Sequence, residues 1–78
     1  MSSLTLPARK LLSSMEVAFI DYGTVQFGIH TMSQHPVTST MELLDEGMIE
    51  FVYVPDGEDY YRFTEDHMNS LLREQTVT

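Results

Sequence analysis

The chain has 78 residues, which is enough for one small hydrophobic core and excludes a multidomain enzyme. Twelve acidic residues against four basic ones give a formal net charge of -8, which disfavours non-specific attraction to nucleic acid and to anionic membranes. Apolar residues make up 42% of the chain, close to the globular average, so we expect it to fold; because cysteine is absent, disulfides, thiolate nucleophiles and cysteine metal sites are excluded.

We expect residues 1 to 78 to form a single small domain, ordered from about residue 5 to about residue 74, because no linker-like or low-complexity stretch divides the chain. The opening seven residues lack the apolar run of a signal peptide, and no stretch approaches the roughly 20 apolar residues of a membrane span. The sequence therefore predicts a cytoplasmic protein that does not associate with membranes.

The first predicted element is an amphipathic helix from Pro7 to Tyr22, in which apolar residues recur at steps of three and four. Pro7 suits the first turn of a helix, and Gly23 is expected to end it. Branched and aromatic residues at 17–20 and 24–29 leave a β-hairpin open as the alternative for this stretch. Residues 24–27 are predicted as a short strand, and residues 28–34 favour no structure. The predicted apolar stripe consists of Ala8, Leu11, Leu12, Met15, Ala18, Phe19 and Tyr22.

A second helix is predicted to begin at His35-Pro36, because the residue before a proline is disfavoured in a helix. Gly47 lies just past its expected end. If the helix begins later, Ser39 and Glu42 have the spacing of a capping box. The apolar positions expected to face the core are Val37, Met41 and Leu44.

A β-hairpin follows, with strands predicted at residues 48–54 and 60–63 and a turn at 55–57, where proline and glycine supply the backbone angles that reverse the chain. Alternation is expected to place Ile49, Phe51 and Tyr53 on one face of the first strand. On the second strand it separates Tyr61 and Phe63 from Tyr60 and Arg62, which makes Tyr60 the best candidate for an exposed aromatic interface anchor.

The last predicted helix begins after Thr64 as its N-cap, with Glu65 and Asp66 in the first turn, where the helix dipole favours negative charge. Its narrow apolar stripe is expected either to pack on the domain or to form the seam of a homodimer. The stripe consists of Met68, Leu71 and Leu72.

The run Met41–Ile49, followed by a hairpin and then Tyr60–Glu65, resembles the end of a winged helix-turn-helix domain of the MarR and PadR kind. In those regulators the recognition helix ends in a leucine-rich turn and a glycine, a wing follows, and the returning strand leads into a final helix. The resemblance covers about residues 36 to 72. It implies an α+β, winged-helix-like fold in which the predicted hairpin is the wing and residues 28–34 form a short second helix.

The same resemblance implies DNA binding through the start of the third helix and through the wing, which gives the hypothesis of a dimeric transcription regulator. The positions that resemble the DNA-reading surface carry Gln34, His35, Thr38, Ser39, Thr40 and Arg62. No lysine or arginine occurs between Lys10 and Arg62, so the charge of the chain argues against this hypothesis, which we keep as the alternative. On a purely structural interpretation, Thr38 to Thr40 only start and cap a helix.

Acidic residues concentrate in the second half of the chain, where residues 40–78 hold ten of them against Arg62 and Arg73. We expect a negative face that binds a protein with a basic surface, including a surface that normally holds nucleic acid, and plain solubility is the competing interpretation. The main hypothesis is a small, acidic, non-catalytic regulatory protein that acts as an inhibitor or a nucleic-acid mimic. In size and charge the chain resembles small acidic proteins of phages and mobile elements, anti-CRISPR proteins among them. The predicted partner-binding residues are Glu42, Asp45, Glu46, Glu50, Asp56, Glu58, Asp59 and Tyr60, and Glu65 and Asp66 continue the same face.

Other functions have weaker support in the sequence. His30, His35 and His67 lack the helical spacing of a zinc site, so we expect no metal and no cofactor. The acidic stretch 56–59 lacks the alternating ligands of a calcium loop and fits a tight turn better. No serine, histidine and aspartate arrangement or glycine-rich phosphate loop is present, so we do not expect an enzyme. A third hypothesis is an assembly subunit that associates through the last helix.

Overall fold

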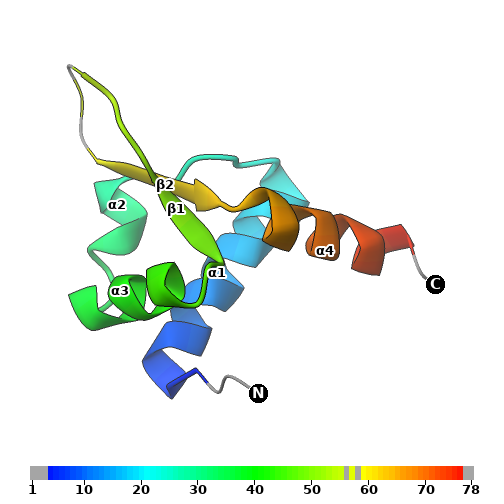
Figure 1. Cartoon of the computed structure of the whole chain (residues 1–78), viewed down its shortest axis with the longest axis horizontal. Helices are drawn as coiled ribbons and strands as arrows, with labels where there is room; N and C mark the ends of the chain where they lie inside the picture. Colours follow the sequence, from blue (N-terminus) through cyan, green and yellow to red (C-terminus); the bar gives the residue numbers. More distant parts are fainter. Residues whose placement is uncertain (1–3, 56, 58, 77–78) are drawn as a thin grey trace.

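The computed structural model describes residues 4–55, 57 and 59–76. Three helices are followed by one antiparallel hairpin and a final helix, which confirms the predicted α+β class (Figure 1). In chain order the elements are α1 (Leu6–Tyr22), α2 (Ile29–Met32), α3 (Val37–Asp45), β1 (Ile49–Val52), β2 (Tyr60–Phe63) and α4 (Glu65–Thr76).

The first predicted helix is confirmed as α1, and the alternative of a hairpin in this stretch is wrong. Gly23 ends the helix in the left-handed conformation, with φ of 69°, which favours glycine. Most of the predicted stripe is buried or partly buried, because its helical spacing lets one face of α1 enter the core. Tyr22 is the exception: it is 82% exposed and does not belong to the core.

Between α1 and α3 the predicted strand at residues 24–27 is reduced to a single antiparallel bridge between Phe27 and Tyr61. The amide of Phe27 donates to the carbonyl of Tyr61 at 2.7 Å, and the amide of Tyr61 donates to the carbonyl of Phe27 at 2.9 Å. One turn of helix, α2, follows the bridge at Ile29–Met32 and buries Met32.

Helix α3 buries a different face from the one predicted. Val37 and Met41, expected in the core, are 71% and 61% exposed, and Leu44 is only partly buried. The residues that face the core are Ser39, Thr40 and Leu43. Because α3 packs against α1, small side chains on the contact face allow a closer approach than larger ones would.

The beginning of α3 lies at the predicted boundary. The helix starts at Val37, and Pro36 occupies the N-cap position without a side-chain hydrogen bond. Ser39 therefore lies inside the helix, so the predicted capping box is wrong. The carboxylate of Glu42 accepts hydrogen bonds from the amide and the hydroxyl of Thr5, at 2.7 and 2.9 Å. This contact ties the beginning of α1 to α3.

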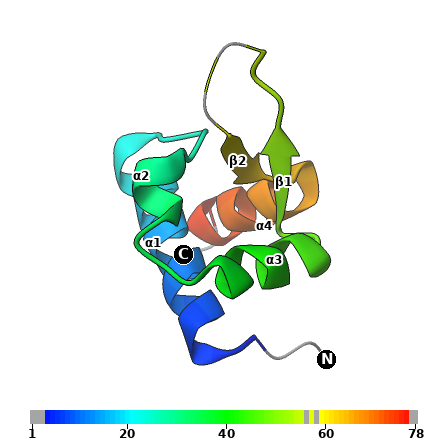
Figure 2. The ribbon, with the colours of Figure 1, turned by 90° about the vertical axis from the view of Figure 1, so that its left-hand side faces the viewer.

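The predicted hairpin is confirmed, with Ile49 opposite Phe63 and Glu50 opposite Arg62. Ile49 and Phe63 are buried at the end of the hairpin that joins α3 and α4. The outer part of the hairpin extends beyond the helices (Figure 2), so alternation there does not bring side chains to the core. Asp56, in the predicted turn, lies outside the described residues.

The expectation that Tyr60 is the best exposed aromatic is wrong. Tyr60 is only partly exposed, and its ring lies against Gly28, where a β-carbon would come within 2.9 Å of the ring. Phe51 and Tyr53, expected on the same face as buried Ile49, are instead 48% and 75% exposed.

Helix α4 packs on its own domain through Leu71, which is 5% exposed, while Leu72 is 50% exposed. Met68 is partly buried against the core. The expected dimer seam is therefore wrong for Leu71, because the core of the same chain already contacts that side chain.

Phe63 lies at the centre of the core, where its ring meets Phe19 and Phe27 edge-on at centroid distances of 5.7 Å. Each of the four helices and two strands buries at least one side chain in this core. Within residues 4–55, 57 and 59–76, no helix combines the length and the hydropathy that crossing a membrane requires. The buried core residues are Ala8, Leu11, Met15, Phe27, Met32, Leu43, Ile49, Phe63 and Leu71.

Candidate protein-binding surface

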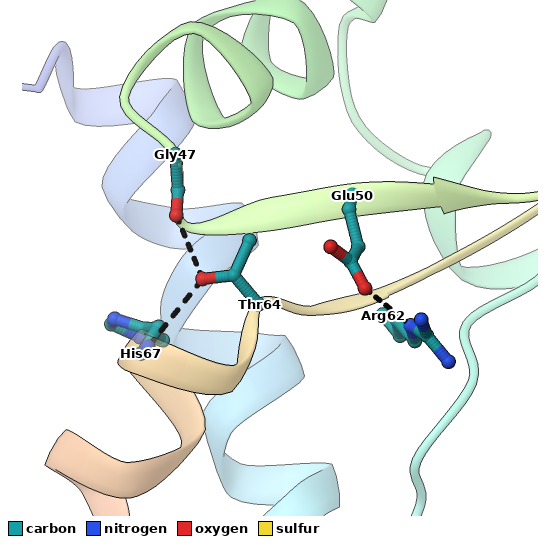
Figure 3. Close-up of polar contacts among 5 residues, drawn as sticks. All are labelled: Gly47, Glu50, Arg62, Thr64 and His67. Carbon is teal, nitrogen blue, oxygen red and sulfur yellow. Dashed lines mark hydrogen bonds and ion pairs between the residues drawn. The ribbon is translucent and has the colours of Figure 1, made fainter.

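One side chain joins the end of α3, the hairpin and the start of α4. The hydroxyl of Thr64 donates to the carbonyl of Gly47 at 2.8 Å and accepts the amide of His67 at 3.4 Å (Figure 3). The second contact confirms Thr64 as the N-cap of α4, and the first fixes that N-cap to the turn after α3.

The local sequence explains why the chain turns at Gly47. Its φ of 72° belongs to the left-handed region, and its amide donates to the carbonyl of Leu44 at 3.1 Å. The amide of Met48 donates back to Leu43, which closes the helix end and points the chain into β1. The amide of Thr64 also donates to the carbonyl of Met48 at 3.1 Å, so backbone and side chain both hold the two segments together.

Five acidic residues lie within three positions of Gly47 or Thr64, and we call this group the acidic junction. The only lysine or arginine equally near is Arg62, whose Nε lies 2.5 Å from the Oε2 atom of Glu50 in an ion pair that is half exposed on both sides (Figure 3). The other four acidic side chains are exposed. The acidic junction consists of Asp45, Glu46, Glu50, Glu65 and Asp66.

A hollow of about 490 Å³ opens at this junction between the hairpin and the first turn of α4. The Glu50 and Arg62 pair forms part of its wall, and Glu65 adds a second carboxylate. Phe63 and Met68 supply the apolar part of the lining. The surface around the junction is therefore concave as well as negative.

His67 joins α4 to α1, which the sequence did not indicate. Its Nε2 atom lies 3.0 Å from Oε2 of Glu16, and its ring lies 5.1 Å from the ring of Phe63. Glu16 is thereby drawn into an internal contact and is not part of the acidic junction. Within the described part of the chain, no three histidine or acidic side chains cluster as metal ligands would.

The structure divides the predicted acidic face into separate places. Asp45, Glu46 and Glu50 lie on the segments that meet at the junction, whereas Glu42 is bound to Thr5 and Asp59 lies in the outer part of the hairpin. Asp56 and Glu58, also predicted in this face, lie outside the described residues. Among the predicted acidic residues that the structure describes, most therefore lie on the segments where α3, the hairpin and α4 meet.

The predicted DNA-reading residues are not presented together. Ser39 and Thr40 are 1% and 5% exposed, so neither side chain is able to reach a base, and this part of the prediction is wrong. Gln34 and Thr38 are exposed, and His35 is half-buried. The burial follows from the rotation of α3, which turns its hydroxyl side chains toward α1.

The four cations of the chain lie on three different elements. Arg9 and Lys10 are exposed near the beginning of α1, Arg62 is paired on β2, and Arg73 lies in the last turns of α4. These segments point to different sides of the molecule (Figure 1). A phosphate backbone would need several cations along one surface, which this distribution does not provide.

Exposed carboxylates accept hydrogen bonds and ion pairs from cationic groups, and the hollow adds apolar surface next to them. This chemistry suits binding to arginine and lysine side chains of another protein. No family model matches the chain, and no curated protein or solved structure matches it.

Proposed function

We propose that this protein is a small, acidic, non-catalytic regulator that binds a basic surface of a protein partner through the acidic junction. The observation that carries the proposal is that the hydrogen bond from Thr64 to the carbonyl of Gly47 joins two chain segments that carry five acidic residues, beside a single arginine that is already paired. A carboxylate with no nearby cation is fully available to a partner's cation.

The order of elements supports a winged-helix-like fold as part of this proposal. The bridge at Phe27 adds a second pairing on β2, α3 precedes the hairpin, and α4 follows it. In DNA-binding proteins of that architecture the third helix and the wing contact the duplex. Here the exposed positions of α3 include Val37, Met41 and Asp45, two apolar side chains and a carboxylate. Such a surface favours a protein over a phosphate backbone.

A basic surface that normally holds nucleic acid is the partner that this charge fits best. The net charge of -8 steers such a partner from a distance, so association is expected to be fast and to weaken as salt rises. Occupation of that surface would inhibit the partner by excluding its nucleic acid, as a phage or mobile-element inhibitor does.

The test is capture from a nuclease-treated lysate of the source organism, with the chain immobilised and two charge-reversed variants in parallel. Glu46→Lys with Glu65→Lys alters two exposed residues of the junction. The control, Asp21→Lys with Glu74→Lys, makes the same change in charge at two exposed helix ends outside the junction, where lysine suits the helix dipole. Wild type and control should retain the same basic proteins, and the junction variant should lose them.

Two results would contradict the proposal. One is equal retention by the junction variant and the control, which would show that the junction does not bind the partner. The other is a gel shift of genomic DNA fragments by the wild-type chain at low salt, which would favour the alternative of a DNA-binding regulator.

A further inference from the structure

An aromatic surface lies on the opposite face of the hairpin from the Glu50 and Arg62 pair. Phe51 is directly opposite Tyr61 in the register, and their rings meet edge-on at a centroid distance of 5.7 Å. Tyr53 follows two residues after Phe51, one position beyond the end of β1, and we assign it to the same face by continuing the alternation of the strand. We call Phe51, Tyr53 and Tyr61 the aromatic stripe.

Tyr61 is partly buried and packs against the core, but the other two residues of the stripe extend outside it. Phe51 is 48% exposed and Tyr53 is 75% exposed, although the first residues of the same strand face, Ile49 and Phe63, are fully buried. The outer part of the hairpin extends beyond the helices that cover its base (Figure 2). Large aromatic side chains held by paired strands and left in water are the type of residue that dominates protein interfaces.

The charge around the stripe restricts what can cover it. Residues 50–59 include four acidic residues and no lysine or arginine. In the described part of this stretch Asp59 is exposed, whereas Glu50 is paired with Arg62 on the opposite face. A purely apolar partner surface would remove water from the carboxylate of Asp59 without replacing its hydrogen bonds, which is costly. The phosphates of a single-stranded nucleic acid would meet like charge, even though its bases stack well on aromatic rings.

We propose that the aromatic stripe is a docking surface for arginine side chains of the protein partner. A guanidinium group is planar, so it stacks on the ring of Tyr53 or Phe51 and still has donors in its plane for carboxylates such as Asp59. The inference rests on the proposed function and deepens it: the acidic junction attracts the basic surface, and the stripe holds its arginines. If the partner contacts both faces of the hairpin, the hairpin would lie in a basic cleft of the partner.

The test is an NMR titration of the whole labelled chain with a peptide of alternating arginine and glycine. The same peptide with citrulline in place of arginine keeps the shape of the side chain and removes its charge. We expect saturable shifts of the ring signals of Phe51 and Tyr53 with the arginine peptide and none with the citrulline peptide. Tyr53→Ser should weaken the binding of the arginine peptide about two- to fivefold, which is the range expected for the loss of a cation–π contact at an exposed site.

Tyr22→Ser is the matched control, because Tyr22 is a still more exposed tyrosine at the end of α1, and it should leave the affinity unchanged. Equal affinity of Tyr53→Ser and wild type would overturn the inference, and so would comparable ring shifts with a single-stranded oligothymidine. If the peptide binds wild type and Tyr53→Ser equally but binds the Glu46→Lys, Glu65→Lys variant more weakly, only the aromatic inference fails. If the arginine peptide does not bind wild type at all, the proposed function fails with it.

Discussion

Thr64 holds the acidic junction together, so its replacement should have a measurable effect on stability. The variant Thr64→Ala removes the donor to the carbonyl of Gly47 and the acceptor for the amide of His67. The first hydrogen bond is short, at 2.8 Å, and should contribute about 1 kcal/mol. The second is long, at 3.4 Å, and should contribute about 0.5 kcal/mol, at the low end for an N-cap.

The expected loss is therefore about 1.5 kcal/mol of unfolding free energy, which corresponds to a fall in Tm of about 6 to 12 °C in a domain of this size. Thr64→Ser keeps the hydroxyl and should lose less than about 0.5 kcal/mol. Circular dichroism during urea and thermal unfolding measures both variants. A Thr64→Ala variant within about 0.5 kcal/mol of wild type, or a Thr64→Ser variant as unstable as Thr64→Ala, would refute this account of the junction.

Three further substitutions test the packing of α3 and α4. Ser39→Ala should raise the unfolding free energy by about 1 kcal/mol, measured by urea titration. It removes a buried hydroxyl without a described hydrogen-bond partner, and alanine favours the helix. A loss of stability would contradict the burial of Ser39 in the contact between α3 and α1. Leu71→Ala should cost about 2 to 3 kcal/mol and Leu72→Ala less than about 0.5 kcal/mol in the same assay, because only Leu71 is buried in the core. Equal losses from the two leucine variants would show that α4 does not pack on its own domain as described.

The predictions that held depend on local chemistry. Gly23 ends α1 because a left-handed backbone favours glycine, and Thr64 caps α4 because its hydroxyl accepts an amide of the first turn. The hairpin is predictable from the sequence because the proline and glycine at 55–57 separate two runs of branched and aromatic residues. In each case the decisive contact lies within a few residues of the signal.

The buried face of α3 was not predictable by the same means. Val37 and Met41 have the spacing of a core stripe, yet the helix is rotated so that Ser39 and Thr40 face inward. In this orientation α3 packs against α1, and Glu42 bonds Thr5, which is 37 residues away in sequence. A helix of nine residues with small polar side chains offers two possible buried faces, and only the tertiary contact selects one.

The candidate site was partly predictable for a related reason. Charge counting identifies the second half of the chain as acidic, but it cannot show that Glu46 and Glu65 lie on either side of one hydrogen bond. The exposed aromatics were assigned to the wrong residues, because alternation alone does not reveal where the helices stop covering the hairpin. The ring of Tyr60 packs against Gly28, whereas Phe51 and Tyr53 are exposed to solvent.

The most direct test of the central claim is the affinity of a captured partner, purified and measured against wild type, the Glu46→Lys, Glu65→Lys variant and the Asp21→Lys, Glu74→Lys control at rising salt. We predict that the junction variant binds on the order of tenfold more weakly than the control at about 50 mM salt, with the difference shrinking as salt screens the charges. Equal affinities of the two variants across the salt series would contradict binding through the acidic junction.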